Sequence, residues 1–210
     1  MSLNLNKIEF VYMDVKYLEY LHNLDSIVQF NPEDPNYDKK PHVGFLIENN
    51  GMKYVIPLTS PKPFHESWGD VTNEWYRIYE VINILETQVK PTDLIVDIKN
   101  QELFEDICND EKCNYKQRIL SILDIRRMIP VKDGVYTKVD FTIGNNFSHS
   151  DNKRIMLMKK EYDFLNKRKI MDGIIKRANK LYDKQMRRGH PLPRQCNYQV
   201  LEQACAEYKI

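Results

Sequence analysis

A chain of 210 residues with 42% hydrophobic and 29% charged residues is long enough to bury a core and has an ordinary globular composition. No stretch approaches 18 uncharged apolar residues, and the segment MSLNLNKIEF lacks a basic region followed by an apolar run, which argues against a membrane span and a secretory signal. The net charge of +1 conceals an acidic body, residues 1–150 with 16 Lys/Arg against 23 Asp/Glu, and a basic segment, residues 151–190 with 13 against 5.

Alternating apolar residues and turn signals predict that the acidic body consists mainly of strands. In chain order, we expect a strand at 7–13, a short helix at 14–25 begun by Asp14, a proline-rich loop at 31–42, strands at 43–48 and 53–58 joined at Asn50-Gly51, and a strand at 74–85. Residues 86–116 are expected to be acidic and irregular, with one strand and one short helix, before strands at 118–131 and 134–143 around an Asp133-Gly134 turn.

The basic segment changes to helical periodicity. We expect a helix from about Lys153 to Arg188, broken or kinked near 166–171 and Gly173, and a last helix at 197–208. The prediction is an α+β fold in one domain, residues 1–210, with a mostly antiparallel sheet of five or six strands in 1–150 and a basic helical part in 151–210. The charge asymmetry suits a polyanionic partner, and a solvated basic helix would explain it equally well.

The four cysteines, Cys108, Cys113, Cys196 and Cys205, have neither the spacing of a zinc site nor the density of a disulfide framework. No Asp, Glu or His cluster has metal-ligand spacing either. We therefore expect reduced thiols in a cytoplasmic protein, with no metal and no cofactor.

The most informative segment is YVIPLTSPKPFH, residues 54–65, where a predicted strand ends in three prolines within seven residues. A residue that precedes proline is pushed into an extended conformation, so the backbones of Ser60 and Lys62 are restrained before the chain folds. If the segment stays extended, Ser60 and Lys62 point to one side and Thr59 to the other. A hydroxyl and an ammonium on one rigid edge could hold a phosphate, and the ordinary pKa of the nearby His65 suits proton transfer.

The chain lacks the phosphate-binding, metalloprotease and serine-hydrolase motifs GxxxxGK[ST], HExxH and GxSxG. One reaction needs only side-chain acids, bases and cations: the cleavage of RNA by attack of its own 2′-hydroxyl. The basic segment would then hold the RNA backbone. From these residues alone, a strand exit with an ordinary Ser, Lys and His remains the commoner alternative.

Residues 31–65, NPEDPNYDKKPHVGFLIENNGMKYVIPLTSPKPFH, resemble the endoribonuclease toxins of type III toxin–antitoxin systems, the ToxN/AbiQ family. The resemblance rests on an acidic, proline-rich loop with a tyrosine, a glycine-containing strand and the PLTSPK strand exit. Weaker matches are LDIRRMIPV at 123–131, KRIMLMKKEYDFLNK at 153–167 and CNYQVLEQACAEY at 196–208.

This resemblance implies a twisted antiparallel sheet or partly open barrel, similar to the MazF/Kid toxin fold, with added C-terminal helices. It implies a bacterial, cytoplasmic enzyme that cuts cellular and phage mRNA without metal, leaves a 2′,3′-cyclic phosphate and causes abortive infection. It also implies that the enzyme processes its own repeat antitoxin RNA into pseudoknots, which inhibit it within a closed RNA–protein assembly.

Matched by position, the resemblance assigns the catalytic site to residues of the loop and of the strand exit: Tyr37, Lys40, Thr59, Ser60, Lys62 and His65. The chemistry of each group suggests phosphate stabilisation by the lysines, orientation of the 2′-hydroxyl by Ser60, and proton transfer or base stacking by Tyr37. Packing is the alternative for Tyr37 and His65. For RNA binding we expect Lys153, Arg154, Lys159, Lys160, Lys167 and Arg168.

Residues 84–117 depart from shorter family members and are interpreted as an insertion whose acidity argues against RNA contact. Two other functions remain open. The chain could be an RNA-binding protein without catalysis, or a protein-interaction domain whose basic segment meets an acidic surface. A requirement for Ser60 distinguishes the enzyme, because simple binding needs no strand-end hydroxyl.

Overall fold

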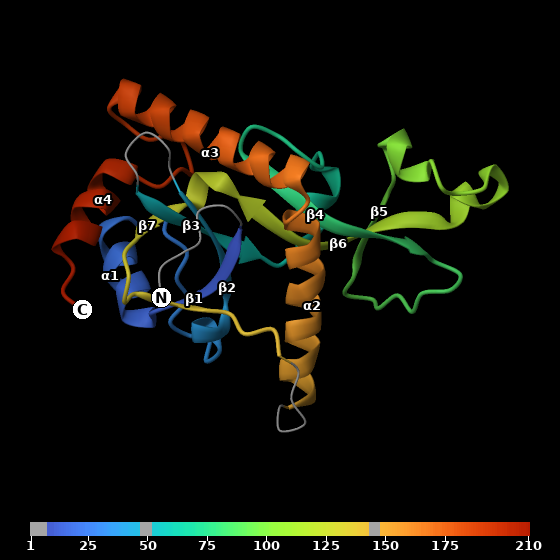
Figure 1. Ribbon diagram of the computed structural model, residues 1–210, viewed down its shortest axis with the longest axis horizontal. Helices are drawn as coiled ribbons and strands as arrows, with labels where there is room; N and C mark the ends of the chain where they lie inside the picture. Colours follow the sequence, from blue (N-terminus) through green and yellow to red (C-terminus); the bar gives the residue numbers. More distant parts are fainter. Residues whose placement is uncertain (1–7, 47–51, 143–147) are drawn as a thin grey trace.

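The computed structural model describes residues 8–46, 52–142 and 148–210, which form an open antiparallel sheet with helices packed on it (Figure 1). The strands of this described part are β1 Glu9–Met13, β2 Pro41–Leu46, β3 Lys53–Thr59, β4 Trp75–Asn83, β5 Leu94–Asp97, β6 Tyr115–Asp124, β7 Ile129–Val131 and β8 Tyr136–Lys138. Their order is β4-β6-β3-β2-β1-β8, with β5 added to β6 and β7 added to β3. The predicted α+β class is confirmed, with more and shorter strands than expected.

Strand β3 connects the two halves of the sheet. One side of β3 pairs with β2 along its length, while the other pairs first with β7 and then, at Leu58 and Thr59, with β6. Pro57 lies where this second neighbour changes from β7 to β6, so a residue without an N–H group fits inside a buried strand. The Asn50-Gly51 turn predicted between β2 and β3 lies outside the described residues.

The prediction of a single strand at 118–131 is wrong, because the chain turns at Asp124. Its carboxylate accepts the Arg126 backbone N–H at 3.2 Å and both the Nε and Nη2 groups of the Arg126 side chain at 2.8 Å. These hydrogen bonds stabilise the start of a short 3₁₀ turn, η5 Ile125–Arg127. After this turn the chain forms a separate strand, β7. The predicted Asp133-Gly134 turn follows, with Gly134 at a φ of +100°, and β8 is only three residues long.

The helices are α1 Val15–Leu24, α2 His149–Leu165, α3 Arg168–Arg188 and α4 Tyr198–Glu207. Asp14 caps α1 as predicted, accepting the Tyr17 N–H at 2.9 Å. Helix α2 begins earlier than expected, because the Ser148 hydroxyl caps a first turn without apolar residues.

The break expected within the basic segment falls between α2 and α3, not at Gly173. Gly173 lies inside α3, where a side chain would collide with the Tyr76 hydroxyl. None of the helices in the described ranges is long and apolar enough to cross a membrane.

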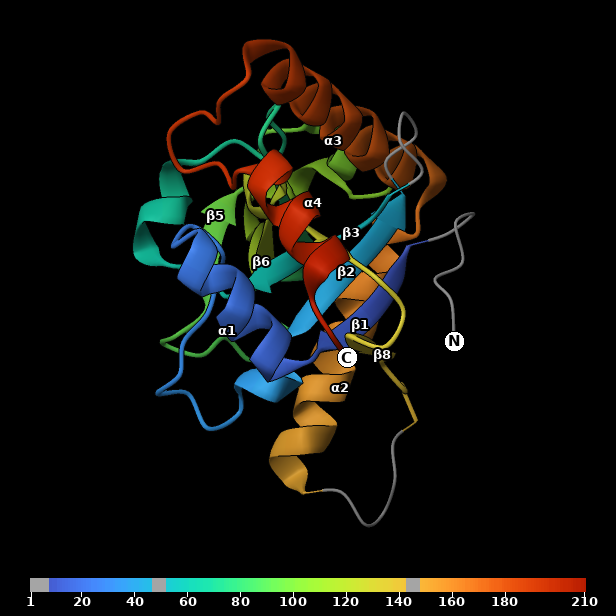
Figure 2. The same ribbon diagram turned by 90° about the vertical axis from the view of Figure 1, so that its left-hand side faces the viewer.

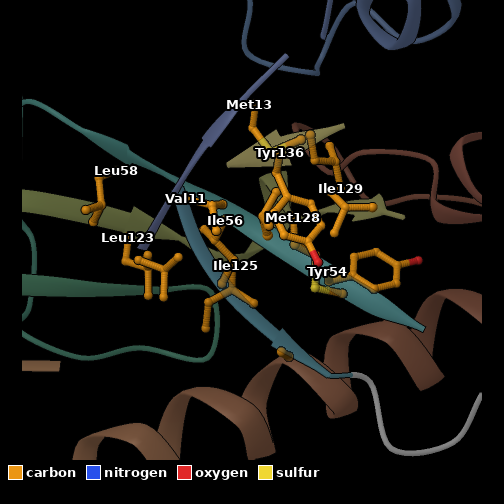
Figure 3. Packing of buried hydrophobic residues seen from close by; sticks show 14 of the residues in the cluster. Val11, Met13, Tyr54, Ile56, Leu58, Leu123, Ile125, Met128, Ile129 and Tyr136 are labelled. Atoms are coloured by element: carbon orange, nitrogen blue, oxygen red, sulfur yellow. The ribbon is translucent and has the colours of Figure 1, made fainter. Parts of the chain in front are cut away.

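The main core lies between the sheet and helices α1, α3 and α4. Figure 2 shows α1 and α4 side by side over the sheet, and Figure 3 shows the apolar residues that they cover. These residues come from five strands and η5 and include Val11, Met13, Tyr54, Ile56, Leu58, Leu123, Ile125, Ile129 and Tyr136. Helix α2 adds Ile155, Met158 and Leu165 to this core and packs against β4 and β6, which places the basic segment beside the end of β3.

Residues 84–114, which we call the arm, connect β4 to β6 and contain β5 and two 3₁₀ turns, Gln101–Phe104 and Asn109–Asn114. The arm extends away from the helices on the right of Figure 1. Neither 3₁₀ turn contains a buried residue. The strand expected in this stretch is present as β5, and two 3₁₀ turns take the place of the expected short helix.

Candidate active site

Strand β3 ends at Thr59, where three neighbouring hollows meet. The large hollow, about 560 Å³, places Ser60 opposite Arg118 of β6 and Lys153, Arg154 and Lys160 of α2. The middle hollow, about 300 Å³, is lined by Lys40, Thr59, Ser60, Arg154 and Glu161. The aromatic cavity, about 260 Å³, is lined by Thr59, Lys62, Phe64, His65, Trp68, Arg127 and Arg194.

Ser60 and Lys62 do not share one hollow, which corrects the simple picture of two side chains on one strand edge. The strand stops at Thr59, and after Pro61 the chain enters a 3₁₀ turn, Pro63–Ser67. Ser60 is exposed toward the large and middle hollows, whereas Lys62 is exposed toward the aromatic cavity. Thr59 borders the middle hollow and the aromatic cavity and therefore connects the two.

A side-chain network joins Thr59 to the acidic loop. The Gln29 side chain donates a hydrogen bond from Nε2 to the Thr59 hydroxyl at 3.1 Å. Its Oε1 accepts a hydrogen bond from the Lys40 ammonium at 3.0 Å. Lys40 also lies over the Tyr37 ring, 5.1 Å from its centroid. The expected loop lysine is therefore held close to the strand exit by Gln29, a residue that sequence reasoning missed.

Lys40 lies in a positively charged environment. Burial, reinforced by Arg127 and Lys62 and partly opposed by Asp34, lowers the pKa of Lys40 to about 8. Lys40, Lys62 and Arg127 outweigh the nearby Asp34 in their effect on this pKa, and such an excess of cations favours a bound anion such as phosphate.

Tyr37 is buried, and its hydroxyl donates a 2.5 Å hydrogen bond to the Gln29 carbonyl. The ring packs edge-on against Phe30, and burial raises the pKa of the phenol. This geometry suits a residue that fastens the acidic loop beside Lys40, as the packing alternative for Tyr37 anticipated.

His65 is also buried, at 4% exposure, yet it lines the aromatic cavity with Thr59 and Lys62. Its Nδ1 accepts the Lys62 backbone N–H at 2.8 Å, so the neutral ring carries its proton on Nε2. Burial, together with the charge of Arg77, lowers the pKa of His65 and favours this neutral form. His65 is thus able to donate a hydrogen bond from Nε2.

Arg77 of β4 fixes the turn that carries His65. Its Nη2 donates to the carbonyl oxygens of His65 at 2.9 Å, of Glu66 at 3.2 Å and of Trp68, while Nη1 pairs with Asp70 at 3.2 Å. Arg77 is only 3% exposed. A buried guanidinium therefore holds the turn after the strand exit in one conformation.

The middle hollow has a buried acid on its α2 side. Glu161 is 3% exposed, and burial, partly offset by the Ser121 hydroxyl, raises the pKa of its carboxyl to about 7. Nothing in the sequence marked Glu161, which stands among basic residues in a helical pattern.

The six predicted RNA-binding residues separate into two groups. Lys153, Arg154 and Lys160 line the large hollow beside Ser60, where Lys160 pairs with Glu80 at 2.7 Å and Arg154 with Asp151 at 2.6 Å. The other three, Lys159, Lys167 and Arg168, line none of these hollows.

The structure adds four arginines to the expected site: Arg118 of β6 in the large hollow, and in the aromatic cavity Arg126 and Arg127 of η5 and Arg194 of the α3–α4 connection. Only the RR pair in the LDIRRMIPV segment gave a signal for Arg127, and no pattern pointed to Arg194. Among the described ranges no group of three or more His, Cys, Asp or Glu side chains could hold a metal ion.

Comparison with known proteins adds a decisive observation. A family model described as the toxin ToxN of type III toxin–antitoxin systems matches residues 9–206. The chain belongs to this family. The family resemblance predicted from residues 31–65 is confirmed.

Two curated relatives of this ToxN family member are both named endoribonuclease ToxN. The protein from Bacillus thuringiensis subsp. kurstaki is 27% identical over 206 residues, covering 94% of this chain and 82% of the relative. The protein from Pectobacterium atrosepticum is 37% identical over 73 residues, covering 34% of this chain and 42% of the relative.

Solved structures share the ToxN fold over nearly the whole chain. A toxin of a bacterial type III system that is selectively inhibited by a non-coding RNA pseudoknot matches with a TM-score of 0.64 and 23% identity, over 96% of this chain and 98% of that one. AbiQ, a lactococcal anti-phage endoribonuclease of a type III system, matches with a TM-score of 0.63 and 18% identity, over 95% of this chain and 96% of AbiQ.

Proposed function

We propose that this ToxN family member is a metal-independent, sequence-selective endoribonuclease that cuts RNA through its own 2′-hydroxyl. One observation carries the proposal: the hydroxyls of Thr59 and Ser60 stand where hollows lined by cations from several separate segments meet. Both curated relatives are named endoribonucleases, which supports the same reaction class.

In the proposed reaction the 2′-oxygen forms a bond to the adjacent phosphorus as the bond to the 5′-oxygen breaks, leaving a 2′,3′-cyclic phosphate. The 2′-proton passes to a base, and the 5′-oxygen receives a proton. Lys40 and Lys62 stabilise the charge on the phosphate, while the Ser60 hydroxyl orients the 2′-oxygen or donates to a non-bridging oxygen. His65 donates a hydrogen bond to the 5′-oxygen from Nε2, the nitrogen that its contact with Lys62 leaves protonated.

The test compares wild type, Ser60→Ala and Ser67→Ala on single-stranded RNA in EDTA. Ser67 is the matched control, because its exposed hydroxyl lies seven residues further along, bonds only the Phe64 carbonyl and lines none of the hollows. Wild type and Ser67→Ala should cut the RNA, with new 3′ ends that resist extension until the cyclic phosphate is removed.

Ser60→Ala should leave the RNA intact while melting like wild type, because an exposed hydroxyl contributes little packing. If Ser60→Ala cuts as fast as wild type, the catalytic assignment fails. If wild type binds RNA but does not cut it, the non-catalytic RNA-binding alternative is correct.

The role of Lys40 as a cation has its own test. Lys40 has a pKa of about 8, so its charge and its contribution to cleavage should be lost as pH rises through that value. Lys40→Arg, which stays charged, should retain cleavage and extend it above pH 8. Loss of activity in Lys40→Arg at every pH, with normal melting, would assign Lys40 to proton transfer instead.

We also propose that a cognate antitoxin RNA pseudoknot inhibits the enzyme in the bacterial cytoplasm, and that cellular and phage mRNA are its substrates. The family description and the RNA-inhibited structural relative support this regulation. Tandem repeats upstream of the gene should encode this RNA. Wild type should process the repeat transcript into single units and join them in a closed RNA–protein complex, whereas Ser60→Ala should leave the transcript whole.

A further inference from the structure

The aromatic cavity includes Lys62 and His65 of the proposed cleavage site and extends past them to rings that the cleavage does not use. It shares Thr59 with the middle hollow, but its opposite wall is made of the Phe64, His65 and Trp68 rings. No step of the proposed reaction uses Phe64 or Trp68.

Phe64 presents an unusually exposed ring at the edge of this cavity. Its exposure is 62%, although the ring lies 4.1 Å from His65 and 5.9 Å from Trp68 between centroids. Trp68 in turn packs on Trp75 with centroids 4.2 Å apart. The chain thus holds one exposed aromatic ring against the buried His65 and the partly buried Trp68 and Trp75.

This wall is rigid because the backbone behind it is fixed. Arg77 binds the carbonyl oxygens of His65, Glu66 and Trp68, and the Lys62 N–H binds the His65 ring. A planar ligand that stacks on Phe64 would therefore not need to order the loop first.

The remaining walls carry an excess of positive charge, with four cations, Lys62, Arg126, Arg127 and Arg194, against one carboxylate, Asp124. The Lys62 ammonium and the Arg194 guanidinium form no ion pair with any residue that the structure describes, and Arg127 lies 3.7 Å from Asp124. Arg126, in contrast, is held by Asp124 at 2.8 Å and Glu74 at 3.0 Å. Two unpaired cations beside an exposed ring suit a ligand with both a flat face and a negative charge.

Arg194 is placed at the cavity by a strained backbone. Its φ of 64° is the only positive value for a non-glycine residue in the described part of the chain. The turn is held by the Gln195 N–H on Leu192 O at 3.1 Å and by the Cys196 N–H on Arg126 O at 3.0 Å. Such strain persists where surrounding contacts enforce it and is concentrated at functional sites.

We infer that the aromatic cavity binds one unpaired RNA nucleotide next to the scissile phosphate, with its base stacked on Phe64 and its phosphate held by Lys62 and Arg194. Stacking on aromatic side chains and contact with cations is how proteins hold unpaired RNA bases. The position next to the cut bond rests on the proposed function, whereas base binding itself does not.

The two tryptophans of the chain, Trp68 and Trp75, both belong to the aromatic stack, so intrinsic fluorescence reports on this cavity. The probe is a mixed-sequence 2′-O-methyl hexanucleotide in EDTA, which lacks the attacking hydroxyl and stays uncut. Wild type should show saturable quenching, whereas an abasic ribose-phosphate strand of equal length should give none.

Variants at Phe64 separate stacking from simple apolar packing. Phe64→Leu should bind the hexanucleotide about tenfold more weakly, and Phe64→Tyr within about twofold of wild type. Leu85→Ala, at a 74% exposed apolar residue of the arm, is the control and should bind normally. Equal melting temperatures of all three variants would show that folding is unaffected.

Binding by Phe64→Leu at wild-type strength, or equal quenching by the abasic strand, would overturn the inference. A separate cleavage assay on unmodified RNA tests the proposed function. If the wild-type protein cleaves RNA but shows no base-dependent quenching, only this inference is rejected. If it shows base-dependent quenching but no cleavage, only the proposed nuclease function is rejected.

Discussion

The arm and the end of strand β3 both leave the sheet, but they are held in place by different forces. The arm has exposed 3₁₀ turns and solvated ion pairs such as Lys116–Asp97, in which the Asp97 side chain is 79% exposed. The turn after β3 is held by one buried arginine that contacts three carbonyl oxygens and a carboxylate. Rigidity is therefore concentrated where the proposed chemistry needs fixed geometry, and the arm shows what a connection without that demand looks like.

The largest expected effect comes from replacing the buried arginine. Arg77→Met should cost about 3–5 kcal/mol of unfolding free energy, because three carbonyl oxygens lose their donor and Asp70 is left with Gln117 alone and no cation. Denaturant titration measures the loss, and RNA cleavage should fall with it as His65 and Phe64 lose their fixed positions.

Arg118 is the matched control for this substitution. Like Arg77 it forms ion pairs, in this case with Glu80 and Asp93. Its side chain is 17% exposed, against 3% for Arg77, and faces the large hollow beside the arm. Arg118→Met should cost about 1 kcal/mol. Equal losses for the two variants would refute the contrast between buried and solvated anchoring.

A second difference between the two regions concerns pH. The native state keeps a proton on Glu161 up to a pKa of about 7, whereas the unfolded chain releases it near its ordinary value. Ionisation of Glu161 therefore lowers stability as pH rises from about 4.5 to 7. Glu161→Gln should be about 1–3 kcal/mol more stable than wild type at pH 8 and equal to it at pH 4.

Asp97 of the arm provides the opposite case. The hydrogen bond from Lys116 lowers the pKa of this exposed carboxyl, so any stability it adds is present above its unfolded pKa and is lost as pH falls through the folded one. Asp97→Asn should therefore leave the pH dependence of stability between pH 5 and 8 unchanged, because Asp97 is ionised in both the folded and the unfolded chain over that range. If Glu161→Gln shows no gain at pH 8, the buried acid is not a source of pH dependence.

The smallest expected effect concerns the cations of the basic segment. Lys153 is exposed in the large hollow without an ion pair among the described residues, so Lys153→Gln should weaken RNA binding about fivefold at 0.1 M salt and reduce the salt slope by about 0.7. Arg168, 93% exposed and outside the hollows, is the control. Equal slopes for Lys153→Gln and Arg168→Gln would move the RNA contact away from the large hollow.

Local sequence signals were enough to predict the strands around the site and the exit after β3. Alternating apolar residues, the Asp14 cap and the Asp133-Gly134 turn act over a few residues, and each is found where expected. The division of 118–131 was missed because it depends on the Asp124 side chain turning back on Arg126, a contact with no characteristic sequence pattern.

The candidate site was predictable only where its residues are close together in the sequence. Gln29, Glu161 and Arg194 come from three other segments, and each belongs to the site because of tertiary packing against the end of β3 or against its neighbours. Their residue types did not indicate a functional site, because a glutamine, an acid in a basic helix and an arginine in a loop are all common at protein surfaces.

The arm also contains two sites for chemical labelling. Its two cysteines, Cys108 and Cys113, are exposed, while Cys196 and Cys205 are buried. A maleimide dye would consequently attach to the arm and spare the rest of the chain. Energy transfer between arms labelled in this way would measure the spacing of protein copies gathered on one RNA, without any substitution in the polypeptide.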